Sequence, residues 1–553
     1  MAIKEFDYII IGAGTAGSVL ANRLSKNPDN NVLVLEAGPG DKSIFINMPA
    51  AFSEPLKSDR LNWGYNSEPE PGMNNRRMYC PRGRVIGGSS SINGMVYIRG
   101  HALDYDKWAQ KGLKDWSYSH CLPYFKKAQR HEQGANEYRG GNGKIHTTAG
   151  SARHPLHAAW INAGQQAGYP YTHDVNGYQQ EGIGPFDRTV WNGERCSAAK
   201  AYLHPAKKRS NLKVMSGCLA LRVLFENDQA KGVEFSRKGK VRKVYARKEV
   251  ILSGGAINSP QLLQLSGVGP AEHLNKLDIS VVSDLPGVGE NLQDHLEVYV
   301  QYECEKPISL YPSVQPYGRL KVGLEWILSR SGPGATNHFE TGGFIRSKSG
   351  IKHPNLQFHF LPLAINYDGS SPAGGHGFQA HVGPMRPTSR GHVRIRSNKP
   401  TDHPEILFNY MGTENDREEM RDAIRLTREI ISQKAFEPYR GKELTPGKEA
   451  KSDSEIDSFV RERGESAYHP TCTCKMGPGS SKDSVVDGEG RVYGTQGLRV
   501  VDASIMPDLI SGNTDTPTVM IAEKIADRIL GKEPLQPSDA SSWIHPDWEN
   551  SQR

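Results

Sequence analysis

Apolar residues recur along the whole chain, and near the N-terminus their period changes twice within a short stretch. A β-branched run at residues 7–11 (DYIII) passes through a glycine turn into the helical pattern AGSVLANRLS, and a second apolar run occupies residues 31–38 (NVLVLEAG). Two strand patterns with a helix pattern between them predict a βαβ unit. Residues 212–252 continue with strand-like segments (LKVMSG, LRVLFE, AKGVEFS, KEVILSGG) that are separated by turn residues.

A different texture begins near residue 296 and lasts to about residue 410. Its short runs, such as LQFHFLP, FQAHVGP and GHVRIRS, predict the strands of an antiparallel sheet. The segment 416–433 (DREEMRDAIRLTREIISQ) has the spacing of an amphipathic helix, and a last helical pattern ends near residue 530. Beyond residue 531 the chain is polar and contains several prolines, which predicts a tail that follows the surface or is disordered.

Length and charge narrow the class of protein. A chain of 553 residues exceeds what one compact core holds, so two or more domains are expected. Lysine and arginine number 68 against 61 aspartate and glutamate residues, and the resulting formal charge of +7 is scattered in short clusters. Such clusters are typical of solvated faces, and they indicate no nucleic-acid-binding module.

The sequence also bears on location and metal binding. The first residues lack the features of a signal peptide, and no run of 18 or more apolar residues occurs, so we expect a cytoplasmic protein without a membrane span. Peripheral attachment to the inner membrane stays open, although no amphipathic anchor is evident. The seven cysteines are dispersed and odd in number, which favours reduced thiols. Cys472 and Cys474 lack a second ligand pair at zinc spacing, so no metal site is predicted.

The glycines of the N-terminal turn indicate a dinucleotide site. Gly12, Gly14 and Gly17 form a G-x-G-x-x-G pattern between strand and helix, and Glu36 ends the next apolar run. Glycines there allow the helix N-terminus to approach a pyrophosphate, and the acid is placed to accept hydrogen bonds from a ribose. The alternative is a purely structural turn. The spacing does not separate NAD from FAD, while an acid at this position argues against NADP.

Longer motifs make the chain resemble a known family, the glucose-methanol-choline (GMC) oxidoreductases. The segments that carry the resemblance, in family order, are GRVIGGSSSINGMVYIRG (83–100), GAINSPQLLQLSGVG (255–269), LPGVGENLQDH (285–295), YHPTCTCKMG (468–477) and LRVVDASIMP (498–507). Together they span residues 4 to about 531. The resemblance implies an α/β protein with a Rossmann-like FAD-binding domain and an interleaved α+β substrate domain built on an antiparallel sheet.

The same resemblance divides the chain into discontinuous domains. The FAD-binding domain is expected at residues 4–155, 196–298 and 465–531, and the substrate domain at 156–195 and 299–464. A polar tail would follow at 532–553.

FAD is the cofactor that the resemblance implies. The residues expected to bind it are Gly12, Gly14, Thr15, Ala16, Gly17, Glu36, Ala37, Gly87, Gly88, Ser89, Asn93, Gly94, Ala220, Asp502, Ala503 and Thr516. Small residues let backbone amides approach the cofactor, although a glycine-rich structural loop is the alternative for residues 83–100. Some relatives attach FAD to a histidine just before the motif's asparagine. Ile92 stands at that position here, so non-covalent FAD is expected.

Two residues are expected to act in catalysis. His469 matches the family's catalytic histidine and would take the proton of an alcohol. The family's second active-site residue is an asparagine or histidine three positions before a threonine of the last helix. If that threonine is Thr518, Asp515 occupies the position, and its carboxylate would shift the pH dependence of His469. The alternative is that Asp515 caps the helix and points away.

Within the family the closest likeness is to its choline-oxidising bacterial members. Choline carries a trimethylammonium group, which aromatic faces and a carboxylate suit. Trp63 and Tyr468 are candidate aromatic contacts and Glu340 is a candidate counter-charge; the alternatives are that Trp63 belongs to the core and that Glu340 is a structural ion-pair partner. The implied products are betaine aldehyde, with a second oxidation to glycine betaine left open, and the implied electron acceptor is a membrane quinone.

Two alternatives remain at this stage. One is a dehydrogenase of neutral primary alcohols with the same fold, and the other is a flavoprotein without catalytic activity.

Overall fold

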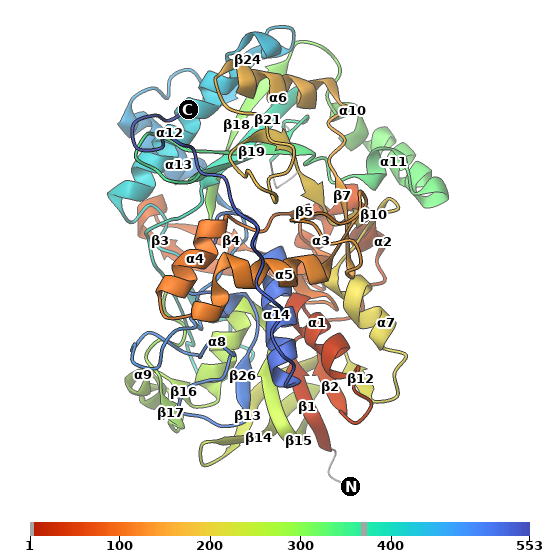
Figure 1. Cartoon of the computed structure of the whole chain (residues 1–553), viewed down its shortest axis with the longest axis vertical. Coiled ribbons are helices and arrows are strands. Elements are labelled where there is room, and N and C mark those ends of the chain that lie inside the picture. The colour runs from red at the N-terminus through yellow and green to blue at the C-terminus, as the bar shows by residue number, and fades with distance from the viewer. Residues whose placement is uncertain (1–4, 367–372) are drawn as a thin grey trace.

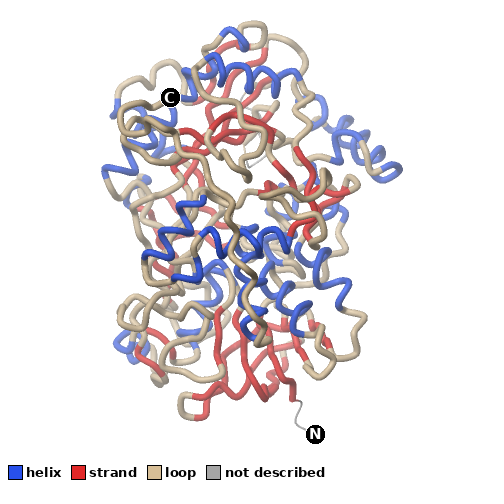
Figure 2. Tube along the Cα trace, in the orientation of Figure 1, coloured by secondary structure: helices blue, strands red, loops and turns tan. Residues whose placement is uncertain are grey.

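Two large sheets organise the chain, and each is assembled from segments that lie far apart in the sequence (Figure 1). The computed structural model describes residues 5–366 and 373–553. Residue 4, where the predicted FAD-binding domain begins, and residues 367–372 of the predicted substrate domain lie outside the described residues. In Figure 2 the strands of the first sheet gather at the lower end of the molecule and those of the second sheet in its upper half.

The first sheet contains the predicted N-terminal βαβ unit. Its strand order is β12 (Leu212–Met215), β2 (Val32–Leu35), β1 (Glu5–Ile11), β15 (Lys240–Leu252), β14 (Gln229–Arg237) and β13 (Cys218–Glu226), and β26 (Leu498–Val500) pairs with β15. The strands from β12 to β15, and β26, are parallel, whereas β13, β14 and β15 form an antiparallel meander. The parallel strands β2 and β26, and β1 from Asp7 onward, are buried on both faces, which explains their almost continuous apolar runs.

Helices from the two ends of the sequence pack together beside this sheet. They are α1 (Thr15–Leu24) and α14 (Asp515–Ile529), which lie side by side in Figure 1. Arg23 of α1 forms an ion pair with the fully buried Glu523 of α14, with Nη2 2.5 Å from Oε1. The helix that follows the glycine turn is therefore held by residues that come some 500 positions later.

The second sheet is antiparallel, as the alternating runs predict. Its order is β24 (Arg440–Thr445), β18 (Leu296–Cys304), β21 (Gly377–Pro384), β20 (Leu356–Leu361), β19 (Thr341–Ile345) and β8 (Gly182–Pro185), and β25 (Glu465–Ser466) pairs with β18. Every pair is antiparallel. The predicted fold class, α/β with an antiparallel second sheet, is confirmed.

The two faces of the second sheet differ in polarity: one packs on the apolar core, and the other carries polar side chains. Apolar side chains of one face share a core with the helices α6 (Pro155–Gln166) and α12 (Glu414–Ile431). The residues that alternate with them are polar: Glu297, Gln301, Gln357, His359, Gln379 and His381. Since neighbouring side chains of a strand point to opposite faces, these polar groups all face away from that core.

The C-terminal tail, residues 532–553, follows the surface without a helix or strand, as one of the two predicted alternatives has it (Figure 1). The Ser538 amide donates to the Ser119 carbonyl at 2.8 Å, and Arg553 Nη1 donates to the Ala167 carbonyl at 2.7 Å. Across the described part of the chain, no helix combines the length and the apolarity needed to cross a bilayer.

Candidate active site

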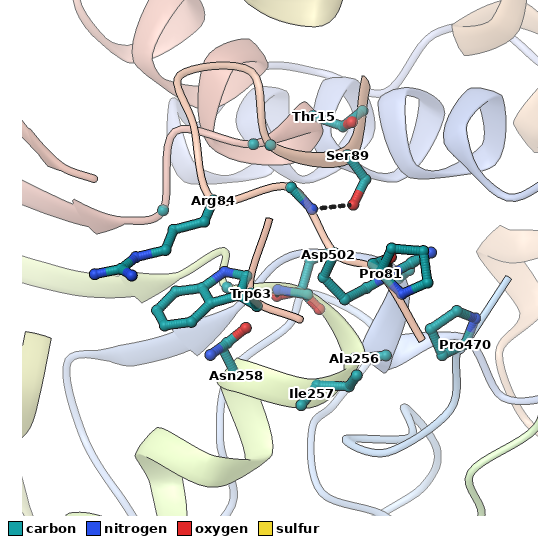
Figure 3. A pocket seen from close by; sticks show the side chains of 18 of the residues that line it. Thr15, Trp63, Pro81, Arg84, Ser89, Ala256, Ile257, Asn258, Pro470 and Asp502 are labelled. Carbon is teal, nitrogen blue, oxygen red and sulfur yellow. Dashed lines mark hydrogen bonds between the residues drawn. The ribbon is translucent and has the colours of Figure 1, made fainter. Parts of the chain in front are cut away.

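Residues from both sheets line one cavity of about 540 Å³, which is within the range of cofactor and ligand sites. Figure 3 shows Thr15 and Ser89 on the side of the glycine turn, Trp63 with Arg84 and Asn258, and Pro470, the residue that follows His469 in the chain. Most of the expected cofactor residues line this cavity: Gly12, Gly14, Thr15, Ala16, Glu36, Ala37, Gly88, Ser89, Asn93, Gly94, Ala220, Asp502 and Ala503. Gly17, Gly87 and Thr516 do not line it.

The glycine turn has the close approaches that a dinucleotide cradle needs. Gly12 has a φ of +101°, and a Cβ atom there would come within 2.4 Å of the Ser253 carbonyl oxygen. A Cβ on Gly17 would come within 1.9 Å of the Gly12 oxygen, so Gly17 supports the turn from behind. Gly88 lies against Gly14, with a notional Cβ 2.7 Å from its Cα. Only glycine fits these positions, and the open backbone is free to face a pyrophosphate.

Glu36 is buried at the end of β2 and holds the turn by hydrogen bonds. Its Oε2 accepts from the Ala13 amide and its Oε1 from the Gly38 amide, each at 2.8 Å. Burial raises the pKa of this carboxyl to about 7 despite these bonds. The residues present therefore fit an adenosine ribose whose hydroxyls would donate to Glu36.

Asp502 plays a structural part at the same end of the cavity. Its Oδ2 accepts hydrogen bonds from the Gly255 amide at 2.8 Å and from the Ser259 hydroxyl at 2.6 Å, both of which belong to α8 (Gly255–Leu265). Its Oδ1 accepts from the Ser504 amide at 2.8 Å. Asp502 thus ties the start of α8 to the segment after β26.

His469 is partly buried in the cavity wall and is held on three sides. Its amide donates to Asp294 Oδ1 at 2.6 Å, which fixes the loop that carries it. Its Nδ1 lies 3.0 Å from Nδ1 of His295, and its Nε2 lies 3.1 Å from Nδ2 of Asn513. Burial lowers the pKa of His469 well below its ordinary value, and neighbouring histidines lower it further. The ring is therefore neutral at pH 7.

The hydrogen bonds assign the tautomer of this ring. His295 is also neutral, because burial lowers its pKa to about 4. Its Nε2 lies 3.0 Å from the Met385 carbonyl, which only accepts, so the proton of His295 resides on Nε2. His295 Nδ1 then accepts a hydrogen bond from His469 Nδ1. The lone pair of His469 is consequently on Nε2, beside Asn513.

Asn513, and not Asp515, is the residue that the structure places at His469. The Asn513 Oδ1 accepts from Gln357 Nε2 at 3.1 Å, which orients the amide so that its Nδ2 points to His469. Asp515 lies at the first position of α14, where its Oδ1 accepts from the Thr15 hydroxyl at 2.6 Å. The prediction that Asp515 partners His469 is wrong by two residues. Asp515 lines the cavity on the side of the glycine turn instead.

The polar face of the second sheet supplies the opposite wall. His359 and His381 pair directly across β20 and β21, and both line the cavity together with Glu297 of β18. His381 Nδ1 lies 3.1 Å from Glu297 Oε1. Phe339 packs edge-on against both histidine rings, with centroids 5.9 and 5.6 Å apart. A buried carboxylate beside an aromatic ring therefore lies in the same cavity as His469.

The three candidate substrate contacts have different outcomes. Glu340 does not line the cavity: its Oε1 pairs with Arg188 Nη1 at 3.0 Å, and its Oε2 accepts from the Ser151 hydroxyl. Arg188 and these bonds hold its pKa near 2 against the effect of burial, so its charge is already compensated. The prediction of Glu340 as the counter-charge of a bound cation is corrected by this geometry, and Glu297 is a carboxyl group that lines the cavity from the second sheet.

Trp63 and Tyr468 both line the cavity. Trp63 stacks on Tyr65 with ring centroids 5.9 Å apart, and the guanidinium of Arg84 lies 5.0 Å from its ring centroid (Figure 3). The carbonyl of Tyr468 accepts from Arg82 Nη2 at 2.6 Å, and its backbone has a φ of 64°. Tyr468 adjoins His469 in the chain, whereas Trp63 already holds a cation against its ring.

Sequence reasoning missed His295, Glu297 and Asn513. His295 ends the LQDH motif and Glu297 follows two residues later, and the Q-x-H pattern of Gln293 and His295 repeats at residues 357–359 and 379–381. The repeated pattern in two adjacent strands was a usable signal, because its polar residues share one face.

All seven cysteines are buried and unpaired, and within residues 5–366 and 373–553 no cluster of three or more His, Cys, Asp or Glu side chains is arranged for a metal ion.

Comparison with known proteins gives a consistent result. The sequence profiles described as GMC oxidoreductase match residues 6–297 and 387–522. The chain is 56% identical over 547 residues to the oxygen-dependent choline dehydrogenase of Yersinia pseudotuberculosis, covering 98% of this chain and 96% of that protein. It is 53% identical to the protein of the same name from Vibrio vulnificus, covering 100% and 99%.

Solved structures agree at the level of the fold. Pyridoxine 4-oxidase from Mesorbium loti superposes with a TM-score of 0.86 at 32% identity, covering 96% of this chain and all of that one. An FAD-dependent oxidoreductase from Chaetomium thermophilum superposes with a TM-score of 0.85 at 29% identity, covering 95% and 99%.

Proposed function

The chain belongs to the GMC oxidoreductase family, and from this premise we propose that it oxidises choline to betaine aldehyde with His469 as the base. The observation that carries the proposal is the neutral His469, whose Nε2 lone pair is assigned by its hydrogen bonds and lies beside the Asn513 amide. The names of relatives that are more than half identical support choline as the substrate.

The cofactor is FAD, as in the family and in its solved members. The glycine turn and Glu36 would hold its adenosine half, and the residues around Gly88 and Asn93 its flavin half. Bound FAD supplies the acceptor for a hydride. Ile92 is buried where some relatives have a histidine, which supports non-covalent binding.

The chain's own groups account for the proton. His469 Nε2 accepts the hydroxyl proton of the substrate, and the Asn513 Nδ2–H group is placed to donate to the oxygen that gains negative charge. His295 keeps the His469 proton on Nδ1, so that the accepting nitrogen faces the substrate. His295 is 1% exposed, so its side of this hydrogen bond is shielded from water. A second oxidation, of the hydrated aldehyde to glycine betaine, would use the same base.

The trimethylammonium group of choline would lie near Glu297. This group has no N–H to donate, so it is recognised by charge and by aromatic faces. Glu297, Phe339 and Tyr468 line the cavity and offer both. A carboxylate in this wall favours choline over the neutral alcohols that other dehydrogenases of the fold would use.

For the electrons, we propose a quinone-type acceptor in the membrane. The relatives carry "oxygen-dependent" in their names, so the test includes both acceptors. The experiment is an anaerobic titration of the yellow protein with choline, followed by air in one sample and a soluble quinone in another. Choline should bleach the flavin absorbance, and the quinone should restore it faster than air. If no alcohol bleaches the flavin, the protein is not a catalyst of this kind.

A second experiment tests the substrate assignment with matched variants. Glu297→Gln should raise the KM for choline roughly 100-fold while leaving that for its neutral carbon isostere almost unchanged, since only choline loses a charge partner. Glu340→Gln is the control, because Glu340 pairs with Arg188 outside the cavity. Equal effects of Glu297→Gln on both alcohols would favour a neutral primary alcohol as the substrate.

A further inference from the structure

The helix α11 (Pro316–Ser329) carries large apolar side chains on the outside of the molecule. Tyr317 is 80% exposed, Leu320 61%, Leu324 51%, Ile327 49% and Leu328 84%. At 100° per residue these positions fall on one stripe, because they are spaced by three, four, three and one residues. An amphipathic helix normally turns such a stripe toward the core.

The inward side of α11 shows that this orientation is fixed by packing. Trp326 lies on the opposite side from the exposed stripe and is only 2% exposed, and its indole N–H donates to the Gly193 carbonyl at 2.6 Å. Figure 1 shows α11 projecting from the side of the molecule, away from both sheets. The packing of Trp326 therefore fixes α11 with its apolar stripe facing outward in the folded protein.

A second apolar patch lies near α11. The short helix α2 (Ile44–Asn47) exposes Ile44 and Phe45, which are 39% and 49% exposed. The strand β11 (Glu194–Arg195) connects the two helices: Glu194 pairs with Arg330 directly after α11 at 2.9 Å, and Arg195 Nε donates to the Ile46 carbonyl at 2.8 Å. Seven of the eleven large apolar side chains that are exposed in the described residues belong to α2 and α11.

The surroundings of these helices are basic. Beside β11, a second cavity of about 570 Å³ is lined by Arg130 and Lys144, and no carboxylate lies within 4.0 Å of either cation among the residues the structure describes. Burial and the nearby Arg23 lower the pKa of Lys144. Arg319 and Lys321 add two exposed cations on α11 itself. The apolar stripe suits the acyl-chain region of a bilayer, and the unpaired cations suit its layer of anionic headgroups.

We propose that α11 and α2, with the basic cleft of Arg130 and Lys144, dock this protein on an anionic lipid bilayer. The inference rests on the proposed membrane acceptor and identifies the surface that would reach it. The position of α2 supports it, because Phe52 and Leu56, a few residues after α2, line the cavity of His469. A lipophilic acceptor leaving the bilayer at this face would meet apolar side chains up to that cavity.

A second copy of the chain suits this face less well. In a two-fold symmetric dimer the same patch faces itself, so Arg319, Lys321 and their neighbours would meet like charges. Lipid phosphates complement them instead. The two occupants predict different solution behaviour, and both can be measured.

The test is flotation of the FAD-loaded protein with vesicles. Vesicles of phosphatidylcholine and phosphatidylglycerol in equal amounts should carry the wild type upward, and high salt or pure phosphatidylcholine should weaken binding at least roughly tenfold. Leu324→Glu with Leu328→Glu should reduce the bound fraction roughly 100-fold, because it replaces two inserted apolar side chains by charges. Val241→Glu is the control, since Val241 is 61% exposed on β15, far from this face.

Further readouts keep the result interpretable. Flavin absorbance and choline-dependent reduction of a water-soluble dye should be unchanged in all variants, which shows that they fold. If the double variant floats as well as the wild type, the proposal is overturned. It is also overturned if light scattering shows a dimer that the double variant converts to a monomer. If the wild-type protein does not reduce the dye when choline is added, the proposed function is contradicted, whereas the docking result still stands.

Discussion

The hydrogen bond from His469 to His295 gives a sharp prediction about a residue that does not touch the cavity. His295 accepts the Nδ1 proton of His469, and it lies behind the ring rather than in the cavity wall. His295→Leu removes the acceptor and puts an apolar side chain of similar bulk in its place. The His469 proton is then no longer held on Nδ1, and its placement on Nε2 blocks the accepting nitrogen.

The size of the effect follows from that bond. A buried donor left without a partner costs about 1–3 kcal/mol, and each 1.4 kcal/mol is a factor of ten in rate. Without His295, the Nδ1–H tautomer of His469 loses the free energy by which this bond favours it. Flavin reduction by choline should therefore slow roughly 10- to 100-fold. The dissociation constant for choline should stay unchanged, because His295 does not line the cavity.

Anaerobic stopped-flow reduction of the flavin separates rate from affinity. His295→Gln is the informative companion, because its amide oxygen can accept from His469 while its N–H group donates to the Met385 carbonyl. Glutamine should recover most of the rate. If the leucine variant reduces its flavin as fast as the wild type, or if glutamine is as slow as leucine, the tautomer argument fails.

Further predictions concern the other groups of the site. Asn513→Ala should slow flavin reduction by roughly 100-fold with little loss of bound FAD, as expected for one donor to a developing charge; a change confined to KM would contradict this role. Asp515→Asn should leave the pH profile of flavin reduction unchanged, since Asp515 bonds Thr15 rather than His469; a shifted profile would restore the coupling that the geometry removes. Acid precipitation should release all flavin into the supernatant, whereas flavin retained on the pellet would indicate a covalent bond. In the FAD-free protein the raised pKa of Glu36, about 7 against 4.5 when unfolded, means that the folded state binds the extra proton between these values, so the free energy of unfolding should fall by roughly 3 kcal/mol as pH rises through this window. Urea titrations of Glu36→Gln should show a flatter pH dependence, and an identical slope would argue against this origin.

The parts of the site that depend on local sequence were predictable. The turn of Gly12, Gly14 and Gly17 and the acid Glu36 act through spacing within one βαβ unit, and the structure brings them to the cavity or directly behind it. The alternating runs around residues 357 and 379 likewise predict the antiparallel sheet, because alternation directly reflects which face of a strand is buried.

The errors arose where position depends on distant partners. The choice between Asn513 and Asp515 turns on where α14 begins, and helix ends are set by packing: Thr15 bonds Asp515 from the other end of the sequence. Similarly, Glu340 is taken out of the site by Arg188, which the sequence does not place near it. Glu297 enters the site only through the pairing of β18 with β21, a register that no single segment encodes.

The meeting of α1 and α14 also has a consequence for how the protein is made. On the ribosome the glycine turn and α1 emerge first, but the partners of α1, Asp515 and Glu523, and the strand β26 beside β15, emerge late. Until then β15 has an open edge along residues 250–252, of the kind that promotes misassociation of nascent chains. The chain would thus bind its flavin only near the end of translation. A prematurely terminated chain would bind no flavin and would remain colourless.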